Sequence, residues 1–178
     1  MVDGLIDAWR LDGNGGAVWV GDDVAAAIAE PDQTVWLHFD RTVSGVDKVL
    51  KDLLGVEPLI ANALLATDTR PRCETYDDGL LINLRGVNLN PGANPEDMLS
   101  VRMWVTGHLI ISLRKAKLMS VDDIRQRLKR ASGPKNASEL VTDLALALSE
   151  RMAPVILGMH DRLDGLEKSA VAESGQES

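Results

Sequence analysis

Residues 98–114 read MLSVRMWVTGHLIISLR, and this stretch decides the fold. Apolar and β-branched side chains fill Met98–Val105 and again His108–Arg114, as is typical of two strands. Thr106 and Gly107 between them form a tight-turn signal, so the stretch predicts an antiparallel β-hairpin. The rest of the expected sheet extends outward from this hairpin.

Two more strands are predicted just before the hairpin, at Arg72–Tyr76 and Leu80–Asn88. An Asp-Gly turn at 78–79 joins them, and the polar loop NLNPGANPED (88–97) leads into the hairpin. The four strands together predict an antiparallel meander. Thr34–Phe39 (TVWLHF) is β-branched and aromatic-rich, so it reads as a buried strand of the same sheet.

The opening of the chain predicts a second hairpin, with strands at Leu5–Leu11 and Ala17–Val20 around the turn DGNGG. Ser120 is the expected N-cap of a helix, and Pro154 should kink the last helix or divide it in two. Apolar residues follow helical spacing in five segments, namely Val24–Ala29, Val46–Leu54, Leu59–Ala66, Val121–Ala131 and a long one that starts at Ser138.

These elements predict an α+β fold of α/β/α-like layers. We expect a mixed, largely antiparallel sheet of about seven strands, flanked by helices, with a long C-terminal helical arm. The chain should form one domain over residues 1–178, divided into a sheet-and-helix body (1–136) and the arm (137–170). The arm carries more apolar surface than a small sheet is expected to cover, which predicts a partner chain or a further segment.

Charge is distributed unevenly along the chain, which has a formal net charge of −8 and a pI of about 4.8. Residues 1–97 hold 17 acidic and 7 basic side chains, whereas residues 98–178 hold 10 acidic and 12 basic. The acidic balance argues against a nucleic-acid partner. The basic excess between Arg114 and Lys135 fits a solvated helix face, or a patch that faces an anion or a membrane.

No targeting or membrane segment is recognisable. The start MVDGLIDAWRL lacks the basic and apolar regions of a signal peptide, and no run approaches about 18 apolar residues. Cys73 is the only cysteine, so no intramolecular disulfide and no CxxC motif can form. We therefore expect a soluble chain in a reducing compartment.

Motifs for catalysis are also missing. The histidines are His38, His108 and His160, and none belongs to an HExxH helix, while GxSxG, GxGxxG and P-loop patterns do not occur. The sequence thus gives no reason to expect an enzyme or a required cofactor.

The first set of candidate site residues consists of arginines in apolar surroundings. A strand arginine either pairs with a structural carboxylate or binds an anion such as chloride, and both interpretations stay open here. The candidates lie in or beside the meander strands: Arg70, Arg72, Arg85, Arg102 and Arg114.

The second set lies in MHDRLDGLE (159–167) on the arm. His160 and Asp164 are four residues apart, so they share a helix face and can meet one metal ion, with Asp161 about 100° away around the helix. The alternative interpretation is a solvated polar helix face. These residues are weak metal-ligand candidates on their own.

Six motifs in order along the chain resemble one family, the cytoplasmic domain of ZntB-type members of the CorA metal-ion transporter superfamily. The motifs are WLHFD (36–40), TRPR (69–72), DDGLLINLRGVN (77–88), LSVRMWV (99–105), LIISLRK (109–115) and SVDDI (120–124). The opening DAWRLDGNGG and the arm segment MHDRLDGLE also fit, so the resemblance covers nearly the whole chain.

The resemblance implies a cytoplasmic domain of a homopentamer, followed by stalk helices, two membrane helices and a Gly-Met-Asn signature, none of which lies within these 178 residues. ZntB-like members move zinc, and the wider superfamily moves magnesium and related ions. We therefore expect a regulatory and assembly domain of a divalent-cation transporter at the cytoplasmic face of the inner membrane, with its own membrane domain as partner. The imidazole of His160 favours zinc as transported or regulatory ion. The alternatives are a magnesium or cobalt transporter domain, a stand-alone enzyme, or an interaction module.

Overall fold

The computed structural model describes residues 2–21, 23–67 and 70–174. Within these residues seven strands form one sheet in the order β2-β1-β3-β7-β6-β5-β4. The strands are β1 (Leu5–Leu11), β2 (Ala17–Trp19), β3 (Val35–Asp40), β4 (Arg72–Tyr76), β5 (Gly79–Gly86), β6 (Leu99–Val105) and β7 (Leu109–Arg114). The helices are α1 (Val24–Ile28), α2 (Val46–Lys48), the π-helix η1 (Val49–Leu53), α3 (Pro58–Leu65), α4 (Met119–Lys129) and α5 (Ala137–Ser174).

The centre of the sheet is the parallel pair β3–β7, with Val35 opposite Leu109 and Leu37 opposite Ile111. The other neighbouring strands in the described sheet pair antiparallel, so the predicted meander β4–β7 is confirmed. Helices cover both faces of this central pair, which explains why its strands read as nearly continuous apolar runs.

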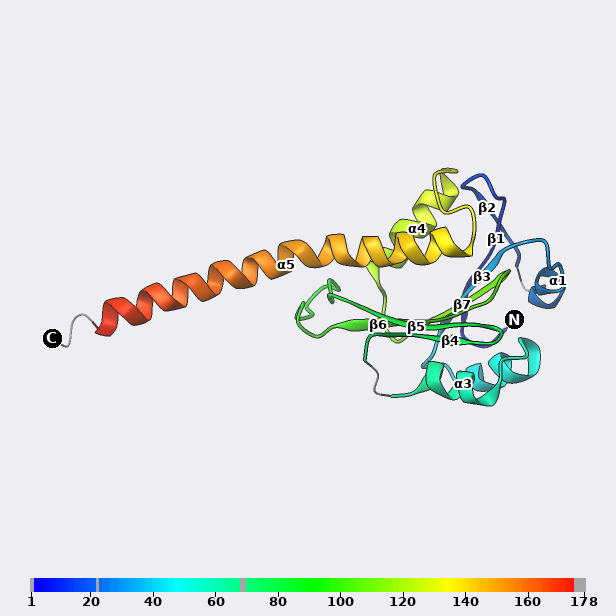
Figure 1. The fold of residues 1–178 in the computed structure, drawn as a ribbon, viewed down its shortest axis with the longest axis horizontal. Coiled ribbons are helices and arrows are strands. Elements are labelled where there is room, and N and C mark those ends of the chain that lie inside the picture. Colours follow the sequence, from blue (N-terminus) through cyan, green and yellow to red (C-terminus); the bar gives the residue numbers. More distant parts are fainter. Residues whose placement is uncertain (1, 22, 68–69, 175–178) are drawn as a thin grey trace.

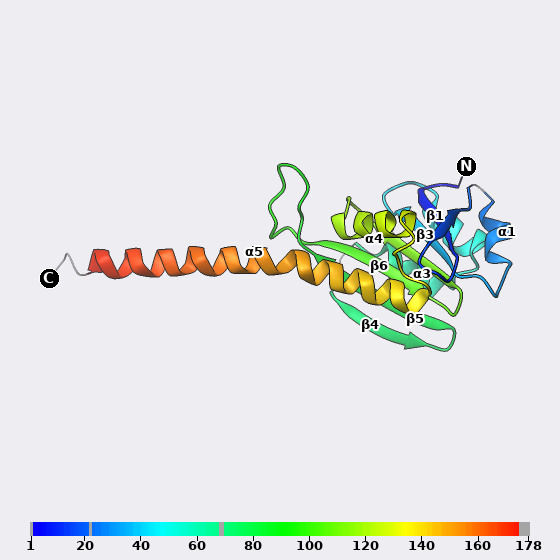
Figure 2. The same cartoon turned by 90° about the horizontal axis from the view of Figure 1, so that it is seen from above.

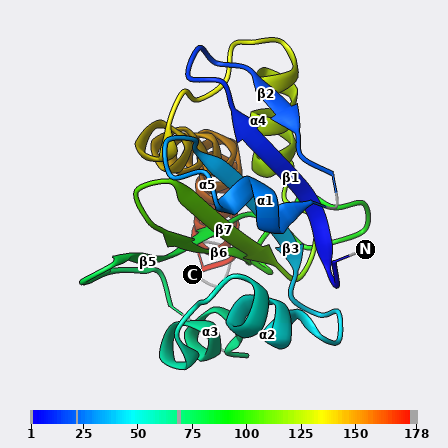
Figure 3. The ribbon, with the colours of Figure 1, turned by 90° about the vertical axis from the view of Figure 1, so that its right-hand side faces the viewer.

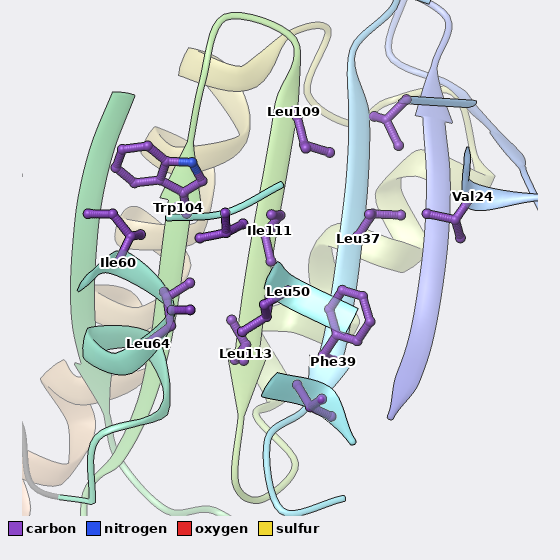
Figure 4. Packing of buried hydrophobic residues seen from close by; sticks show 14 of the residues in the cluster. Val24, Leu37, Phe39, Leu50, Ile60, Leu64, Trp104, Leu109, Ile111 and Leu113 are labelled. Carbon is purple, nitrogen blue, oxygen red and sulfur yellow. The ribbon is translucent and has the colours of Figure 1, made fainter. Parts of the chain in front are cut away.

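Helices α1 to α3 cover one face of the sheet, and α4 and α5 cover the other (Figures 1 and 3). On the first face the helix residues Leu50, Ile60 and Leu64 pack against Leu37 and Leu113, among others, as Figure 4 shows. On the second face the α4 residues Val121, Ile124 and Leu128 and the α5 residues Leu140, Leu144 and Leu148 pack against Trp36, Met103 and Ile110. The predicted α/β/α-like layering and mixed sheet are thus confirmed.

Two local predictions are wrong. Ser120 does not cap α4, because that helix already begins at Met119 and buries the serine within its first turn, while Leu118 occupies the cap position. The segment 46–54 is not a regular α-helix, since one α turn passes into the π turn of η1. The wider winding turns Leu53 outward, so its side chain is 36 % exposed.

Helix α5 continues without interruption across Pro154 and extends far beyond the sheet (Figure 2). The alternative in which the proline divides this segment is therefore wrong. Proline lacks a backbone N–H, so one intrahelical hydrogen bond is missing where the helix has already left the body. In the described part of the chain, no helix combines the length and apolar character required to cross a membrane.

Candidate functional site

The arm is attached to the body through the first turns of α5. Leu140, Leu144 and Leu148 are buried in the core beneath α4 and α5. Arg151 then binds Asp123 of α4 with a two-pronged contact, Nε donating to Oδ2 at 2.8 Å and Nη2 donating to Oδ1 at 2.7 Å. A bidentate arginine–carboxylate pair fixes both distance and orientation, so it defines the direction in which α5 leaves the body.

Past Arg151 the arm exposes an apolar surface. Five large apolar side chains there are between 47 % and 71 % exposed, namely Ile156, Leu157, Leu163, Leu166 and Val171. Scattered exposed leucines are ordinary on a soluble protein, but a run of them along one helix marks a surface that another element covers. The expectation of uncovered apolar surface on the arm is confirmed for the isolated chain.

The loop between β5 and β6 supplies one contact to the outer arm. Arg162 donates from Nη2 to Oε1 of Glu96 at 3.0 Å, and both side chains are at least half exposed. A cavity of about 330 Å³ lies beside this pair, between Pro95 of the loop and Pro154 and Met159 of the helix. The loop thus touches the arm without packing tightly against it.

His160, Asp161 and Asp164 are all exposed on the outer arm. Within the described ranges, no group of three or more His, Cys, Asp or Glu residues is placed to hold a metal ion. Zinc in proteins normally takes a tetrahedral set of ligands. A site at His160 would therefore need ligands from another chain or from elements outside these residues, and it stays a prediction.

The sheet register sorts the candidate arginines by face. Arg72 lies opposite Asn83 on β5, and Asn83 lies opposite Arg102 on β6, so the three side chains share one face. Arg85 lies two residues after Asn83 and therefore on that face too. Arg102 identifies the face as the α3 side, because its Nη1 donates to the carbonyl of Leu64 at 2.9 Å.

Arg70 lies just before β4, where its carbonyl accepts a hydrogen bond from Nδ2 of Asn83 at 2.7 Å and its side chain is exposed. Arg72 pairs with Glu74 at 3.3 Å. Arg102 also donates to the carbonyl of Ala66, so its guanidinium caps the carboxyl end of α3, where the helix dipole favours a cation.

Arg114 lies apart from the other arginines, on the α4 side of the sheet. It is opposite Asp40 on β3, and its positive charge acts on Asp7, His38 and Asp40. The register therefore gathers Arg72, Arg85 and Arg102 on one face and places Arg114 on the other.

A buried polar cluster under α4 surrounds His38, whose side chain is inaccessible to solvent. The Nδ1 atom of His38 lies 2.7 Å from Oγ of Ser112, which also accepts a hydrogen bond from Nε1 of Trp36 at 2.8 Å. The Nε2 atom of His38 is buried and has no hydrogen-bond partner among the described residues. Burial, reinforced by the charges of Arg114 and Arg125, lowers the pKa of His38 to about 3.

Asp7 on β1 belongs to the same cluster and is 1 % exposed. Its Oδ2 lies 3.0 Å from Nε of Arg125 on α4, and its Oδ1 accepts a hydrogen bond from Trp9. Burial raises the pKa of Asp7, and the charge of Arg125 opposes that rise. Burial would also raise the pKa of Asp122, but hydrogen bonds from Lys117 and Arg125 outweigh it and hold that pKa below its usual value.

The sequence did not reveal this cluster as a unit. His38 stands out in an otherwise apolar strand, and Asp7 interrupts the apolar run of β1, so each residue alone is a visible signal. Arg125, whose charge acts on both residues, lies more than 80 residues away in the chain, and only the pairing of β1 with β3 brings Asp7 beside His38.

Comparison with known proteins agrees with this architecture. A family model described as CorA-like Mg²⁺ transporter protein matches residues 31–178. The Divalent cation transporter CmaX of Pseudomonas aeruginosa is 41 % identical over 172 residues, which cover 96 % of this chain and 52 % of that protein. The chain thus spans about half the length of this relative.

Solved structures show the same fold. The full-length CmaX protein superposes with a TM-score of 0.85 at 42 % identity, over 92 % of this chain and 51 % of that one. The ZntB cytoplasmic domain from Vibrio parahaemolyticus superposes with a TM-score of 0.77 at 28 % identity, over 91 % and 64 % of the two chains. Because the family match extends over most of the sequence, this chain belongs to the CorA-like Mg²⁺ transporter family.

Proposed function

We propose that this chain is the cytoplasmic regulatory and assembly domain of a divalent-cation transporter that carries zinc across the inner membrane. It performs no catalysis. Its own membrane domain is its partner, and several copies assemble around one pore, as a pentamer on the family resemblance. Family membership and the likeness to the ZntB cytoplasmic domain support this proposal.

The observation that carries the proposal is the uncovered apolar face of the arm. Ile156, Leu163 and Leu166 lie toward one side of the outer arm and are 47 %, 52 % and 68 % exposed. A soluble domain that worked alone would gain nothing from keeping this surface in water. A domain that joins membrane helices or other copies needs such a surface for contact.

Charge adds a second function, the attraction of cations. Residues 1–97 carry 17 acidic and 7 basic side chains, and their summed field raises the local concentration of divalent cations. The arm would then couple the body to the pore by changing its direction when ions or neighbouring subunits bind.

Zinc is preferred to magnesium because His160 offers a nitrogen ligand, whereas magnesium is bound almost entirely by oxygen. The second candidate is a magnesium or cobalt transporter, which the description of the matching family model favours. The two differ in which cation the complete protein moves.

The test uses the complete gene product. Its reading frame should continue past Ser178 into two hydrophobic segments, and the purified protein in proteoliposomes should take up Zn²⁺ and not Mg²⁺, followed with ion-selective dyes. Uptake of Mg²⁺ alone would support the second candidate. A stop codon directly after Ser178 would overturn the transporter proposal and favour a stand-alone interaction module.

The assembly role has its own test. Leu163→Gln and Leu166→Gln should each weaken the oligomer of the complete protein in sedimentation velocity, because they place polar groups in the proposed contact. Leu59→Gln is the matched control, since Leu59 is 65 % exposed on α3, away from the arm. Equal effects of the three substitutions on the oligomer would show that the arm does not form the assembly contact.

A further inference from the structure

The α3 face of the sheet carries a group of polar side chains that we call the arginine face. It consists of Arg72, Asn83 and Arg102 in one row across β4, β5 and β6, followed by Arg85 and Ser100 in the next row. Directly paired side chains in neighbouring antiparallel strands lie within reach of one another. Three guanidinium groups therefore share a small area of one sheet face.

Part of the arginine face lies beyond the end of α3. The helix ends at Leu65, and Arg102 binds the carbonyl groups at that end, so the row of Arg85 and Ser100 lies farther out. Arg72 is exposed, and both Arg85 and Ser100 are partly exposed. All three residues therefore present part of their surface to solvent.

Among the arginines of this face, Arg85 has the fewest partners for its positive charge and its N–H donors. None of the ion pairs found among the described residues includes it. Its Nε atom is buried and has no acceptor within the same part of the chain. By contrast, Arg72 has Glu74 at 3.3 Å and Arg102 has helix carbonyls. A buried guanidinium N–H without an acceptor is unfavourable, and an anion would relieve this.

We propose that the arginine face binds a phosphate-class oxyanion, with Arg85 as its central contact and Arg72 and Ser100 beside it. Guanidinium presents a planar set of N–H donors that matches two oxygens of a tetrahedral anion, and the Ser100 hydroxyl can donate to a third. A monatomic halide offers only one acceptor atom to that planar donor set, so it matches the set less well. The site has a charge opposite to the net charge of −8 of the chain, so its occupation would cancel a local positive field.

The test is titration calorimetry of the chain with inorganic phosphate, at constant ionic strength set with sodium chloride. Phosphate should bind saturably to the unchanged chain. Arg85→Gln should weaken this binding at least about tenfold, since it removes hydrogen bonds between charged groups. Arg85→Lys, which keeps the charge but loses the planar donor set, should fall between the two.

The matched control is Arg130→Gln, because Arg130 is exposed at the end of α4 on the other side of the sheet. It should leave phosphate binding within about twofold of the unchanged chain. Circular dichroism of each variant establishes that it is folded. In amide NMR spectra of the unchanged chain, phosphate should shift the signals of Arg85 and Ser100, and this measurement needs no variant.

Two ligand sources share this chemistry, free phosphate and a phosphorylated metabolite. Tighter binding of adenosine monophosphate than of inorganic phosphate would identify a phosphorylated metabolite as the ligand. Tighter binding of inorganic phosphate would identify free phosphate. The proposal is wrong if phosphate produces no saturable binding, if chloride displaces it at equal concentration, or if Arg85→Gln and Arg130→Gln weaken binding equally.

Discussion

A carboxylate oxygen of Asp7 on β1 and Nε of Arg125 on α4 lie 3.0 Å apart beneath α4, where the Asp7 side chain is 2 % exposed and that of Arg125 is 28 % exposed. Neither of these two atoms completes a hydrogen bond with the other, so the pair is a charge contact. It joins the first strand of the chain to a helix that also holds the arm through Asp123.

Breaking this pair from the arginine side should be more harmful than removing both charges. Arg125→Met leaves the buried carboxylate of Asp7 without its nearest cation and should lower the free energy of unfolding by about 3 kcal/mol. Adding Asp7→Asn should restore most of the loss, because the amide carries no charge and its oxygen still accepts from Trp9. Urea unfolding of the single and double variants measures this, and simple additivity would contradict it.

The buried imidazole of His38 should make stability depend on pH. The folded pKa is about 3 and the ordinary value is 6.5, so only the unfolded chain takes up a proton as the pH falls between these values. Stability is therefore fully present above pH 6.5 and should decline by about 1.4 kcal/mol for each pH unit below it.

Other groups near His38 act differently. Asp40 and Asp122 have lowered pKa values, so their contribution is lost only below the ordinary aspartate value of 3.8, whereas the raised pKa of Asp7 opposes the trend of His38. Measuring the free energy of unfolding of the chain and of His38→Gln between pH 4.5 and 6.5 isolates the contribution of the histidine. The unchanged chain should lose about 2 kcal/mol more at pH 5 than the variant does, relative to pH 7. Parallel pH profiles of the two proteins would contradict this prediction.

The two arginine contacts of the arm should differ in strength. Arg151→Met removes a bidentate pair with part-buried groups and should lower the free energy of unfolding by about 1 kcal/mol. Arg162→Met removes only the exposed contact to Glu96 and should cost about 0.3 kcal/mol or less. Thermal unfolding at low and high salt measures both, and a larger loss for Arg162→Met would reverse this assignment.

Zinc binding on the arm is the prediction that no contact in the structure tests. Calorimetry should detect weak zinc binding that depends on His160 together with Asp164 and Asp161, and His160→Ala should abolish it. Zinc binds only neutral imidazole, so binding should weaken below about pH 6. His108→Ala is the control, because His108 lies at the β6–β7 turn, away from the arm. Equal zinc binding by the unchanged chain and His160→Ala would exclude His160.

The strands could be predicted from sequence because each has a local signal. Thr106-Gly107 and the apolar runs around it specify the β6–β7 hairpin without knowledge of the rest of the chain. The parallel pairing of β3 with β7 has no such signal, since its partners are more than 70 residues apart. The same applies to Asp7 and Arg125, and to the row that gathers Arg72 and Arg102 on one face.

The predictions of where a helix starts and which type it is were wrong where packing of the core overrides local preference. Ser120 has the chemistry of an N-cap, yet the core beneath α4 takes Leu118 and Val121 and draws the helix start back to Met119. The apolar spacing of Val46–Leu54 fits an α-helix, but the π turn lets Val46 and Leu50 reach the core while Leu53 faces solvent. Pro154 lies in a part of α5 that has left the sheet, so the missing hydrogen bond does not end the helix.

Helix α5 behaves mechanically as a lever whose short end is buried. Its fulcrum lies near Arg151, and the stretch from there to Ser174 spans about 35 Å at the rise of an α-helix. A tilt of about 5° at Leu144 or Leu148, no more than a slight repacking of the core, would move the far tip by about 3 Å over that length. A small repacking of the body would thus displace the far tip by about the width of an ion.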